Sequence, residues 1–323
     1  MRYFVKISYD GSSFNGWQVQ PNAPTVQECL ENSLSTLLKT RVSVVGAGRT
    51  DTSVNAVGYM AHFDFNGPVP QTLAGPDGEL DAVKFGYKLN AILPSAIVVH
   101  EVREVADDLH ARFSATRREY TYFIHRTKDP FIEEHSYFYP WALDVDAMNT
   151  AAQALMGTHD FRCFEKVGAD NKTSICTIVE AEWRFYEPSH AAVMGFPPSC
   201  IAAFDENLPA GGCYLYFRIS ADRFLRNMVR AVVGSLLEVG RGRRTVESFA
   251  ALVLPAPDSA AAPVFDSAPF SAADSVFDSA PGSATSPAVE AGRSRVAADG
   301  TPFRSKAGES VPGHALFLSS VDY

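Results

Sequence analysis

The stretch VVGAGRTDTSVNAVG, residues 44–58, decides between two folds for the first part of this chain. It places Gly46-Ala47-Gly48 directly after a predicted strand over residues 41–45, as a dinucleotide-binding turn does. Such a turn also needs a third glycine and a following helix whose N-terminus receives a pyrophosphate. Here position 51 is Asp, and the residues after it alternate as in a strand. The pattern therefore argues against dinucleotide binding and predicts a glycine loop between two strands.

The spacing of apolar residues predicts strands and helices on both sides of the glycine loop. A period of two predicts strands over residues 1–10, 56–65 and 96–105, and a period near 3.6 predicts helices over 24–39 and around 81–91. Thr25 is the predicted N-cap of the first helix, with Glu28 three residues later. The order β-α-β-β-α-β predicts an α+β domain with an antiparallel or mixed sheet.

A comparable set of elements follows from Arg117. The predicted strands and helices cover residues 118–125, 144–157, 177–186, 213–220, 222–240 and a closing strand over 313–323. We therefore expect two tandem units, an N-terminal half over residues 1–105 and a C-terminal half over 106–323. Two segments fall outside this scheme. Residues 187–212 are expected to be a surface loop, and the low-complexity residues 253–310 are expected to be disordered.

The charge of −9 is unusual for a nucleic-acid binder, but the positive charge is concentrated. Residues 216–244 carry a net +5 and residues 110–128 a net +4. Either stretch is a solvated face or a phosphate-binding strip, and charge alone does not separate the two. The five cysteines form no CxxC pair, which argues against a disulfide framework or a zinc site. With neither a signal-peptide pattern nor a long apolar run, we expect a soluble cytoplasmic protein.

Three groups of side chains are candidates for chemistry. Arg49 and Asp51 in the glycine loop are either an ordinary surface ion pair or part of a site. Tyr120, flanked by arginines on its predicted strand, is either a core residue or a platform on which a base stacks. Arg230 recurs with Arg223 and Arg226 at helical spacing over residues 222–238, and Gly234 leaves room on that face for a close backbone approach. The sequence has no Walker-type loop, no H-E-x-x-H and no clustered Cys/His site, so an enzyme built on this chain would work with one carboxylate, one aromatic ring and one arginine.

In order and spacing, several motifs of this chain resemble those of the tRNA pseudouridine synthase A family. They include YDGSSFNGWQVQ, GAGRTD, LNAILP, DDLHARFSAT, YTYFI, FLRNMVRAVVGSLLEVG and ALFLSSVDY. The resemblance implies the α+β pseudouridine synthase fold, in which two tandem ferredoxin-like or RRM-like α/β halves share an extended, mostly antiparallel sheet with a catalytic cleft. It also implies a homodimer that acts on tRNA without a cofactor or a metal.

The resemblance assigns roles to individual residues. Asp51 is the expected catalytic aspartate, Arg230 its partner, Tyr120 the ring that stacks on the target uracil, and Arg49 a residue that helps to move the base out of the stack. The expected reaction converts uridine to pseudouridine at positions 38–40 of the anticodon arm. Whether the carboxylate attacks C6 of the base or C1′ of the sugar, or removes a ribose proton, stays open. The expected additional RNA contacts are Arg112, Arg117, Arg118, Arg223 and Arg226.

The chain departs from the family directly after Asp51. The family usually continues Ala-Gly-Val-His-Ala, whereas this chain has Thr52-Ser53-Val54-Asn55-Ala56. Losing the glycine restricts the backbone, and an amide cannot titrate as an imidazole does. Because the aspartate, tyrosine and arginine are kept, we predict a working enzyme. The alternative is a catalytically silent tRNA-binding protein on the same scaffold.

Overall fold

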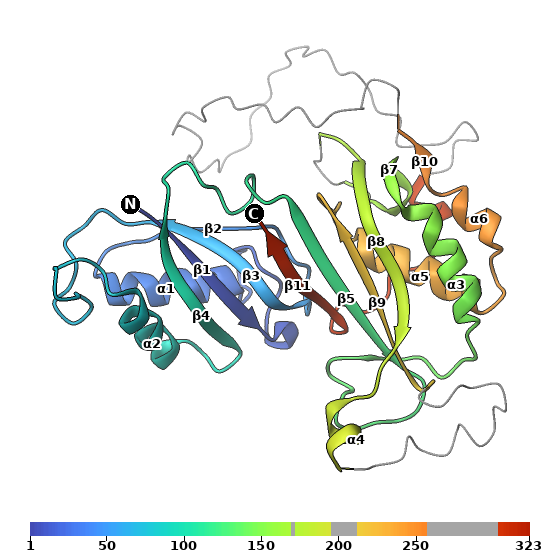
Figure 1. The fold of residues 1–323 in the computed structure, drawn as a ribbon, viewed down its shortest axis with the longest axis horizontal. Helices are drawn as coiled ribbons and strands as arrows, with labels where there is room; N and C mark the ends of the chain where they lie inside the picture. Colours follow the sequence, from blue (N-terminus) through green and yellow to red (C-terminus); the bar gives the residue numbers. More distant parts are fainter. Residues whose placement is uncertain (169–171, 195–211, 257–302) are drawn as a thin grey trace.

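The computed structural model describes residues 1–168, 172–194, 212–256 and 303–323 (Figure 1). The N-terminal half has the predicted order of strands and helices. Its elements are β1 (Arg2–Tyr9), α1 (Val26–Leu38), β2 (Val44–Gly46), β3 (Asn55–Asp64), α2 (Ala82–Ile92) and β4 (Ile97–Val105). The Thr25 hydroxyl accepts a hydrogen bond from the Glu28 backbone N–H at 3.4 Å, which confirms the predicted N-cap of α1.

The C-terminal half contributes the longer list of elements. They are β5 (Arg117–His125), β6 (Tyr137–Phe138), α3 (Val145–Ala152), β7 (Gly157–Asp160), β8 (Ile175–Phe185), α4 (Ser189–Met194), β9 (Tyr214–Ala221), α5 (Met228–Gly240), α6 (Val246–Ala250), β10 (Leu254–Pro255) and β11 (Leu316–Asp322). In the described part of the chain, no helix combines the length and the apolar character that crossing a membrane requires.

One sheet runs through both halves. Its eleven strands within the described residues follow the order β10-β7-β8-β9-β5-β11-β3-β1-β4, with β2 added to β3 and β6 added to β5. Neighbouring strands are antiparallel except at the β11–β3 and β5–β6 pairs. The predicted α+β class with an extended, mostly antiparallel sheet is confirmed. The last strand of the chain joins the two halves.

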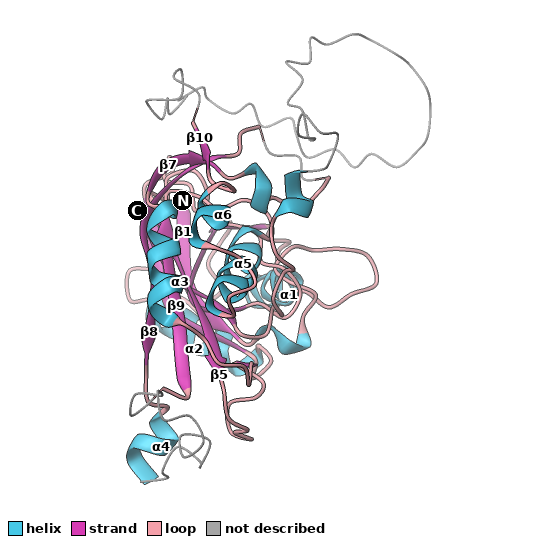
Figure 2. Cartoon of the chain, turned by 90° about the vertical axis from the view of Figure 1, so that its right-hand side faces the viewer, coloured by secondary structure: helices cyan, strands magenta, loops and turns pink. Residues whose placement is uncertain are grey.

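The helices build two hydrophobic cores on the sheet, α1 and α2 over the N-terminal half and α3, α5 and α6 over the C-terminal half (Figures 1 and 2). Leu30 and Phe85 are fully buried in the first core, and Phe217 and Val232 in the second. Tyr120 of β5 packs against both cores. The two hydrophobic cores therefore meet at this ring.

Two predicted elements are shorter than expected. The strand over residues 41–45 is reduced to Val44–Gly46 because side chains of α1 take its backbone groups. Ser35 accepts from the Val42 N–H at 3.0 Å, and Glu31 accepts from the Val44 N–H at 2.8 Å. These bonds replace the sheet partners that an additional strand would have provided on that side.

The helix predicted over residues 222–240 begins only at Met228. Asn227 is left-handed, with a φ of 64°, and the Arg226 carbonyl accepts from the Lys166 N–H at 3.1 Å rather than from a following turn. Arg223 and Arg226 therefore lie in an irregular segment, and the prediction that they share a helical face with Arg230 is wrong.

The two segments set apart by composition include regular elements. Helix α4 occupies part of the predicted loop 187–212, and residues 195–211 lie outside the described residues. In the predicted disordered stretch 253–310, one end forms β10 and the other a 3₁₀ helix, Phe303–Lys306. Disorder was the wrong expectation for those two ends, and residues 257–302 lie outside the described residues.

Gly234 allows the segment at Glu309 to pass close to helix α5 on its way to β11. A Cβ placed on this glycine would lie 1.8 Å from the carbonyl oxygen of Glu309, a distance at which backbone must move. The predicted close approach over Gly234 is confirmed.

We predict that Gly234→Ala lowers the free energy of unfolding by about 1–3 kcal/mol, because the added methyl group displaces the segment at Glu309. Gly86→Ala in helix α2 is the matched control. Its Cβ would have neighbours no closer than 3.8 Å, so helix propensity should leave stability unchanged or raise it by about 1 kcal/mol. Urea unfolding of both variants measures the difference. Equal stabilities would contradict the steric explanation.

Candidate active site

The loop between β2 and β3 carries Asp51 and is anchored on both sides. The Thr50 hydroxyl lies 2.9 Å from the Tyr9 hydroxyl, and the Thr50 carbonyl accepts from the Trp17 N–H at 3.3 Å. The Asp51 carbonyl accepts a hydrogen bond from the Val54 N–H at 3.2 Å, which closes a turn directly after Asp51. The loop then enters strand β3 and not a helix, so no helix N-terminus is available there for a pyrophosphate.

The first glycine of the loop is required for space. A Cβ on Gly46 would lie 2.0 Å from the Tyr59 hydroxyl oxygen and 2.6 Å from the Trp17 ring, whereas a Cβ on Gly48 would meet no atom within 4 Å. Neither glycine has a positive φ. Gly46 therefore lets the loop lie directly on two aromatic rings, and backbone freedom is not what selects it.

Asp51 faces two arginines of the C-terminal half. Arg230 Nη1 lies 3.4 Å from Asp51 Oδ2, and Arg226 Nε lies 3.9 Å from Asp51 Oδ1. The Arg230 side chain is 22% exposed and that of Arg226 54%, so the Arg230 contact is the better shielded from water. Arg230 Nε also donates to the Val311 carbonyl at 2.6 Å, which fixes the plane of the guanidinium group. The residues paired with Asp51 are 175 or more positions away in sequence, yet they converge on it.

Tyr120 lies on β5 at the junction of the two cores. Its ring meets that of Phe224 edge to face, with centroids 5.1 Å apart and an interplanar angle of 89°. Burial raises the pKa of Tyr120 to about 12, the positive charge of Arg118 opposes this, and the negative charge of Asp51 adds to it. The phenol is therefore neutral at ordinary pH.

A second group of arginines lies near this centre. Burial lowers the pKa of Arg112, and the positive charges of Arg49 and Arg223 lower it further. Arg112 thus lies close enough to Arg49 and to Arg223 to be repelled by both, and Arg49 itself is exposed. Such a concentration of positive charge is suited to a polyanion.

The Arg118 side chain is hydrogen-bonded to backbone carbonyl groups of the protein itself. Its guanidinium group donates to the carbonyls of Ala47 at 3.1 Å, Arg112 at 2.6 Å and Asp222 at 2.8 Å. This arginine therefore links the glycine loop, the segment before β5 and the segment before α5. Burial lowers its pKa.

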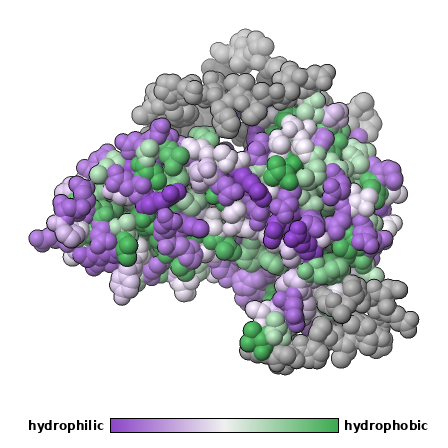
Figure 3. Space-filling view, viewed as in Figure 1, coloured by the Kyte–Doolittle hydropathy of each residue, from purple (hydrophilic) through white to green (hydrophobic). Residues whose placement is uncertain are grey.

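Arg117 lies on the other face of the sheet. Strand alternation turns it away from Tyr120, and it pairs with Glu119 and Glu180, each at 3.3 Å. Arg218 extends this charged network. Hydrophilic side chains gather over the middle of the molecule in the space-filling view (Figure 3). The structure thus brings Arg226 and Arg230 to Asp51 and places Arg112 near Arg49 and Arg223, whereas Arg117 lies on the other face of the sheet.

Sequence reasoning missed two partners of the site. Phe224 lies within a quoted motif, but no pattern indicated that its ring would meet Tyr120. No sequence pattern indicated that the Val311 backbone carbonyl would orient Arg230.

In the described ranges, no group of three or more His, Cys, Asp or Glu side chains is placed to hold a metal ion.

Ser53 adopts a conformation that favours glycine. Its φ is +62°, in the left-handed region, and its N–H donates to the Phe14 carbonyl at 3.3 Å. This is the position at which the family motif has glycine. The loop therefore keeps the geometry that a glycine would adopt, and the serine bears a backbone strain of about 1–2 kcal/mol.

Comparison with known proteins gives a consistent result. The model of a family described as "tRNA pseudouridine synthase" matches residues 151–278. The tRNA pseudouridine synthase A of Bacteroides thetaiotaomicron is 38% identical over 322 residues, covering 100% of this chain and 90% of its own length. That of Parabacteroides distasonis is also 38% identical, covering 100% and 96%. The Bacillus subtilis protein of the same name is 38% identical over 81% of this chain and 93% of its own length.

We predict that Ser53→Gly raises the free energy of unfolding by about 0.5–1 kcal/mol, because relief of the left-handed strain exceeds the extra entropy that glycine loses on folding. Thr52→Gly is the control, since Thr52 has no positive φ and should lose stability. Chemical denaturation of the two variants tests this. A Ser53→Gly protein no more stable than the wild type would refute the strain.

Proposed function

The chain belongs to the tRNA pseudouridine synthase A family, and we propose that it isomerises uridines 38–40 of the tRNA anticodon arm with Asp51 as the nucleophile. It is an isomerase, as the names of its relatives indicate. The observation that carries the proposal is the approach of Asp51 to Arg230 and Arg226, beside Tyr120. One carboxylate, one ring and a pair of guanidinium groups meet where the two halves join.

The reaction breaks the N1–C1′ bond of uridine, rotates the uracil and joins C5 to C1′. The proton on C5 is released to solvent. A carboxylate supports this by attacking C6 or C1′ or by removing a ribose proton, and the side chains around Asp51 are compatible with each pathway. The two arginines hold Asp51 in place by electrostatic attraction, and Arg230 is itself held by the Val311 carbonyl.

The target uridine must leave its stack before a carboxylate can reach it, which costs a few kcal/mol. We propose that Tyr120 recovers part of this by stacking on the uracil, with Phe224 bracing its ring. Arg49 lies two residues from Asp51 on the exposed side of the loop and is assigned to displacing the base. Neither role requires the phenol to ionise.

The tRNA phosphates are assigned to the arginine group formed by Arg49, Arg112 and Arg223. Each of these contacts would release counterions and make affinity fall with salt. Arg118 and Arg117 are already bound to carbonyl groups and to glutamates, so their assignment as RNA contacts is the weaker part of the proposal.

Other expectations from the resemblance remain predictions. They are the division into halves at residues 105 and 106, the homodimer and the cytoplasmic location. The second candidate function, a silent tRNA-binding protein, is favoured only by the substitutions at Thr52, Ser53 and Asn55. It differs from the first in one measurable property, the turnover of uridine.

We predict that Asp51→Asn abolishes tritium release from tRNA carrying [5-³H]uridine, with a loss of at least about 10³-fold, because the amide is a poor nucleophile. The variant should still bind tRNA in a filter assay. Asp107→Asn is the control, since that carboxylate is 80% exposed and pairs with the N-terminus. A transcript with cytidine at positions 38–40 should release no tritium. Absence of release by the wild-type protein, with binding intact, would establish the silent binder.

We predict different effects for the two arginines that face Asp51. Arg230→Gln should lower kcat on the order of 100-fold, because it removes a shielded charge held at 3.4 Å. Arg226→Gln should lower kcat less than about fivefold, because its exposed pair at 3.9 Å is screened by water. Single-turnover rates at saturating enzyme compare the two variants. Equal losses would show that burial does not set the importance of these arginines.

A further inference from the structure

A short segment before β11, residues 311–315, contacts Arg230, strand β5 and the loop that carries Asp51. Besides the bond from Arg230 Nε to the Val311 carbonyl, the Val311 N–H donates to the Arg230 carbonyl at 3.3 Å. The Pro312 carbonyl accepts from the Tyr122 hydroxyl at 3.1 Å. A Cβ on Gly313 would lie 2.5 Å from the carbonyl oxygen of Thr52, the residue after Asp51. The segment therefore lies between Arg230 and the loop of Asp51.

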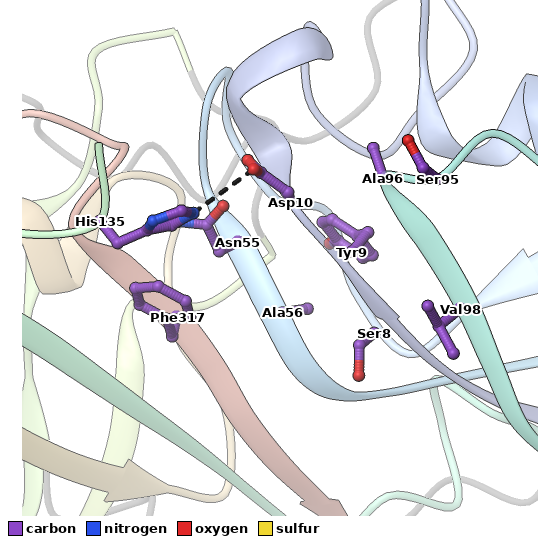
Figure 4. Close-up of a pocket in the computed structure, with 10 residues that line it drawn as sticks. All are labelled: Ser8, Tyr9, Asp10, Asn55, Ala56, Ser95, Ala96, Val98, His135 and Phe317. Carbon is purple, nitrogen blue, oxygen red and sulfur yellow. Dashed lines mark ion pairs between the residues drawn. The ribbon is translucent and has the colours of Figure 1, made fainter. Parts of the chain in front are cut away.

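Asn55 ties the loop of Asp51 to this segment. It is the first residue of β3 and only 1% exposed. Its side-chain Nδ2 donates to the His314 carbonyl at 2.6 Å, and its Oδ1 accepts from the Gly11 N–H at 2.7 Å. It also borders the shallow pocket in which His135 pairs with Asp10 (Figure 4).

The two partners of Asn55 require one donor and one acceptor. The Gly11 N–H can only donate, and the His314 carbonyl can only accept, so the amide fits in a single orientation. Leaving either backbone group unpaired in this buried place would cost about 1–3 kcal/mol. No apolar side chain or carboxylate satisfies both partners.

We propose that Asn55 is a positioning residue for catalysis: by bridging Gly11 and His314, it fixes the Asp51 loop against the segment that orients Arg230. The inference rests on the proposed roles of Asp51 and Arg230. Asp51 and Arg230 come from different halves, and their separation of 3.4 Å depends on how the loop and the segment are held together. Small displacements of a catalytic group are costly in rate, so loosening this bridge lowers kcat more than tRNA affinity.

The test is Asn55→Asp, which has the same shape and keeps the acceptor toward Gly11 but presents a second acceptor to the His314 carbonyl. We expect kcat to fall at least tenfold, while KM for tRNA stays within about twofold. Asn149→Asp is the matched control. That asparagine bridges the N–H and the C=O of Trp183, at 2.7 and 3.1 Å, so its variant loses the same type of bond elsewhere. We expect it to lose stability but keep kcat.

Asn55→His provides a second readout that a purely structural role would not produce. A neutral imidazole offers one acceptor and one donor, and should restore kcat at pH 8. Protonation near the ordinary histidine pKa of about 6.5 removes the acceptor, so the activity ratio of the variant to the wild type should fall below that pH. In this activity ratio, the effect of any titrating group that both proteins share cancels.

Two results would overturn the positioning role. One is an Asn55→Asp protein with wild-type kcat, or one whose kcat loss is matched by Asn149→Asp. The other, decisive if Asn55→Asp does not fold, is an Asn55→His ratio that stays flat between pH 8 and 5.5. An inactive wild-type protein would instead refute the proposed function, and is recognised before any variant is made.

Discussion

Strand β11 is the constraint on which the site depends. It pairs in parallel with β3, placing Leu318 opposite Ala56, and antiparallel with β5, placing the same residue opposite Tyr120. Strand spacing then puts the Cα atoms of Ala56 and Tyr120 about 10 Å apart, two strand intervals. Because Ala56 follows Asp51 by five residues, this single pairing brings the aspartate loop of one half beside the aromatic ring of the other. Without β11, the parts of β3 and β5 that pair with it would be exposed edges.

The segments around this junction are held mainly through backbone groups. Gly46 lies on two aromatic rings, Gly313 against the Thr52 carbonyl and Gly234 against the Glu309 carbonyl, each at a distance that excludes a Cβ. Arg118 adds three carbonyl contacts from separate segments. Charged side chains near the site therefore divide into two kinds, those that assemble the protein and those, such as Arg49, that remain exposed for a polyanion. Local arrangement, and not the net charge of −9, is what permits RNA binding.

The sequence predicts elements better than it predicts where they meet. Alternation and capping at Thr25 locate β1, α1 and β3 because these signals act over a few residues. The late start of α5 was missed because Asn227 turns left-handed for tertiary reasons, through contacts such as the Lys166 bond to Arg226. The spacing of Arg223, Arg226 and Arg230 looked helical, yet only Arg230 lies on the helix. Asp51, Tyr120 and Arg230 are candidates from their sequence patterns and take their roles from the resemblance. Phe224 and the Val311 carbonyl are recognised only from three-dimensional contacts, to Tyr120 and Arg230, across about 80 to 100 residues of chain.

The departures from the family after Asp51 bear on whether the protein turns over its substrate. Ser53 lies in the left-handed region that favours glycine, at a cost in strain that a folded domain tolerates. Asn55 satisfies a donor and an acceptor at once, as a neutral imidazole also can. Both residues are thus held in a defined loop conformation, and Asp51 contacts Arg230. A scaffold that retained only tRNA binding would have no need to hold a carboxylate against a half-buried arginine beside an aromatic ring. The hypothesis of a working enzyme therefore explains more of the site geometry than the hypothesis of a catalytically silent tRNA-binding protein does.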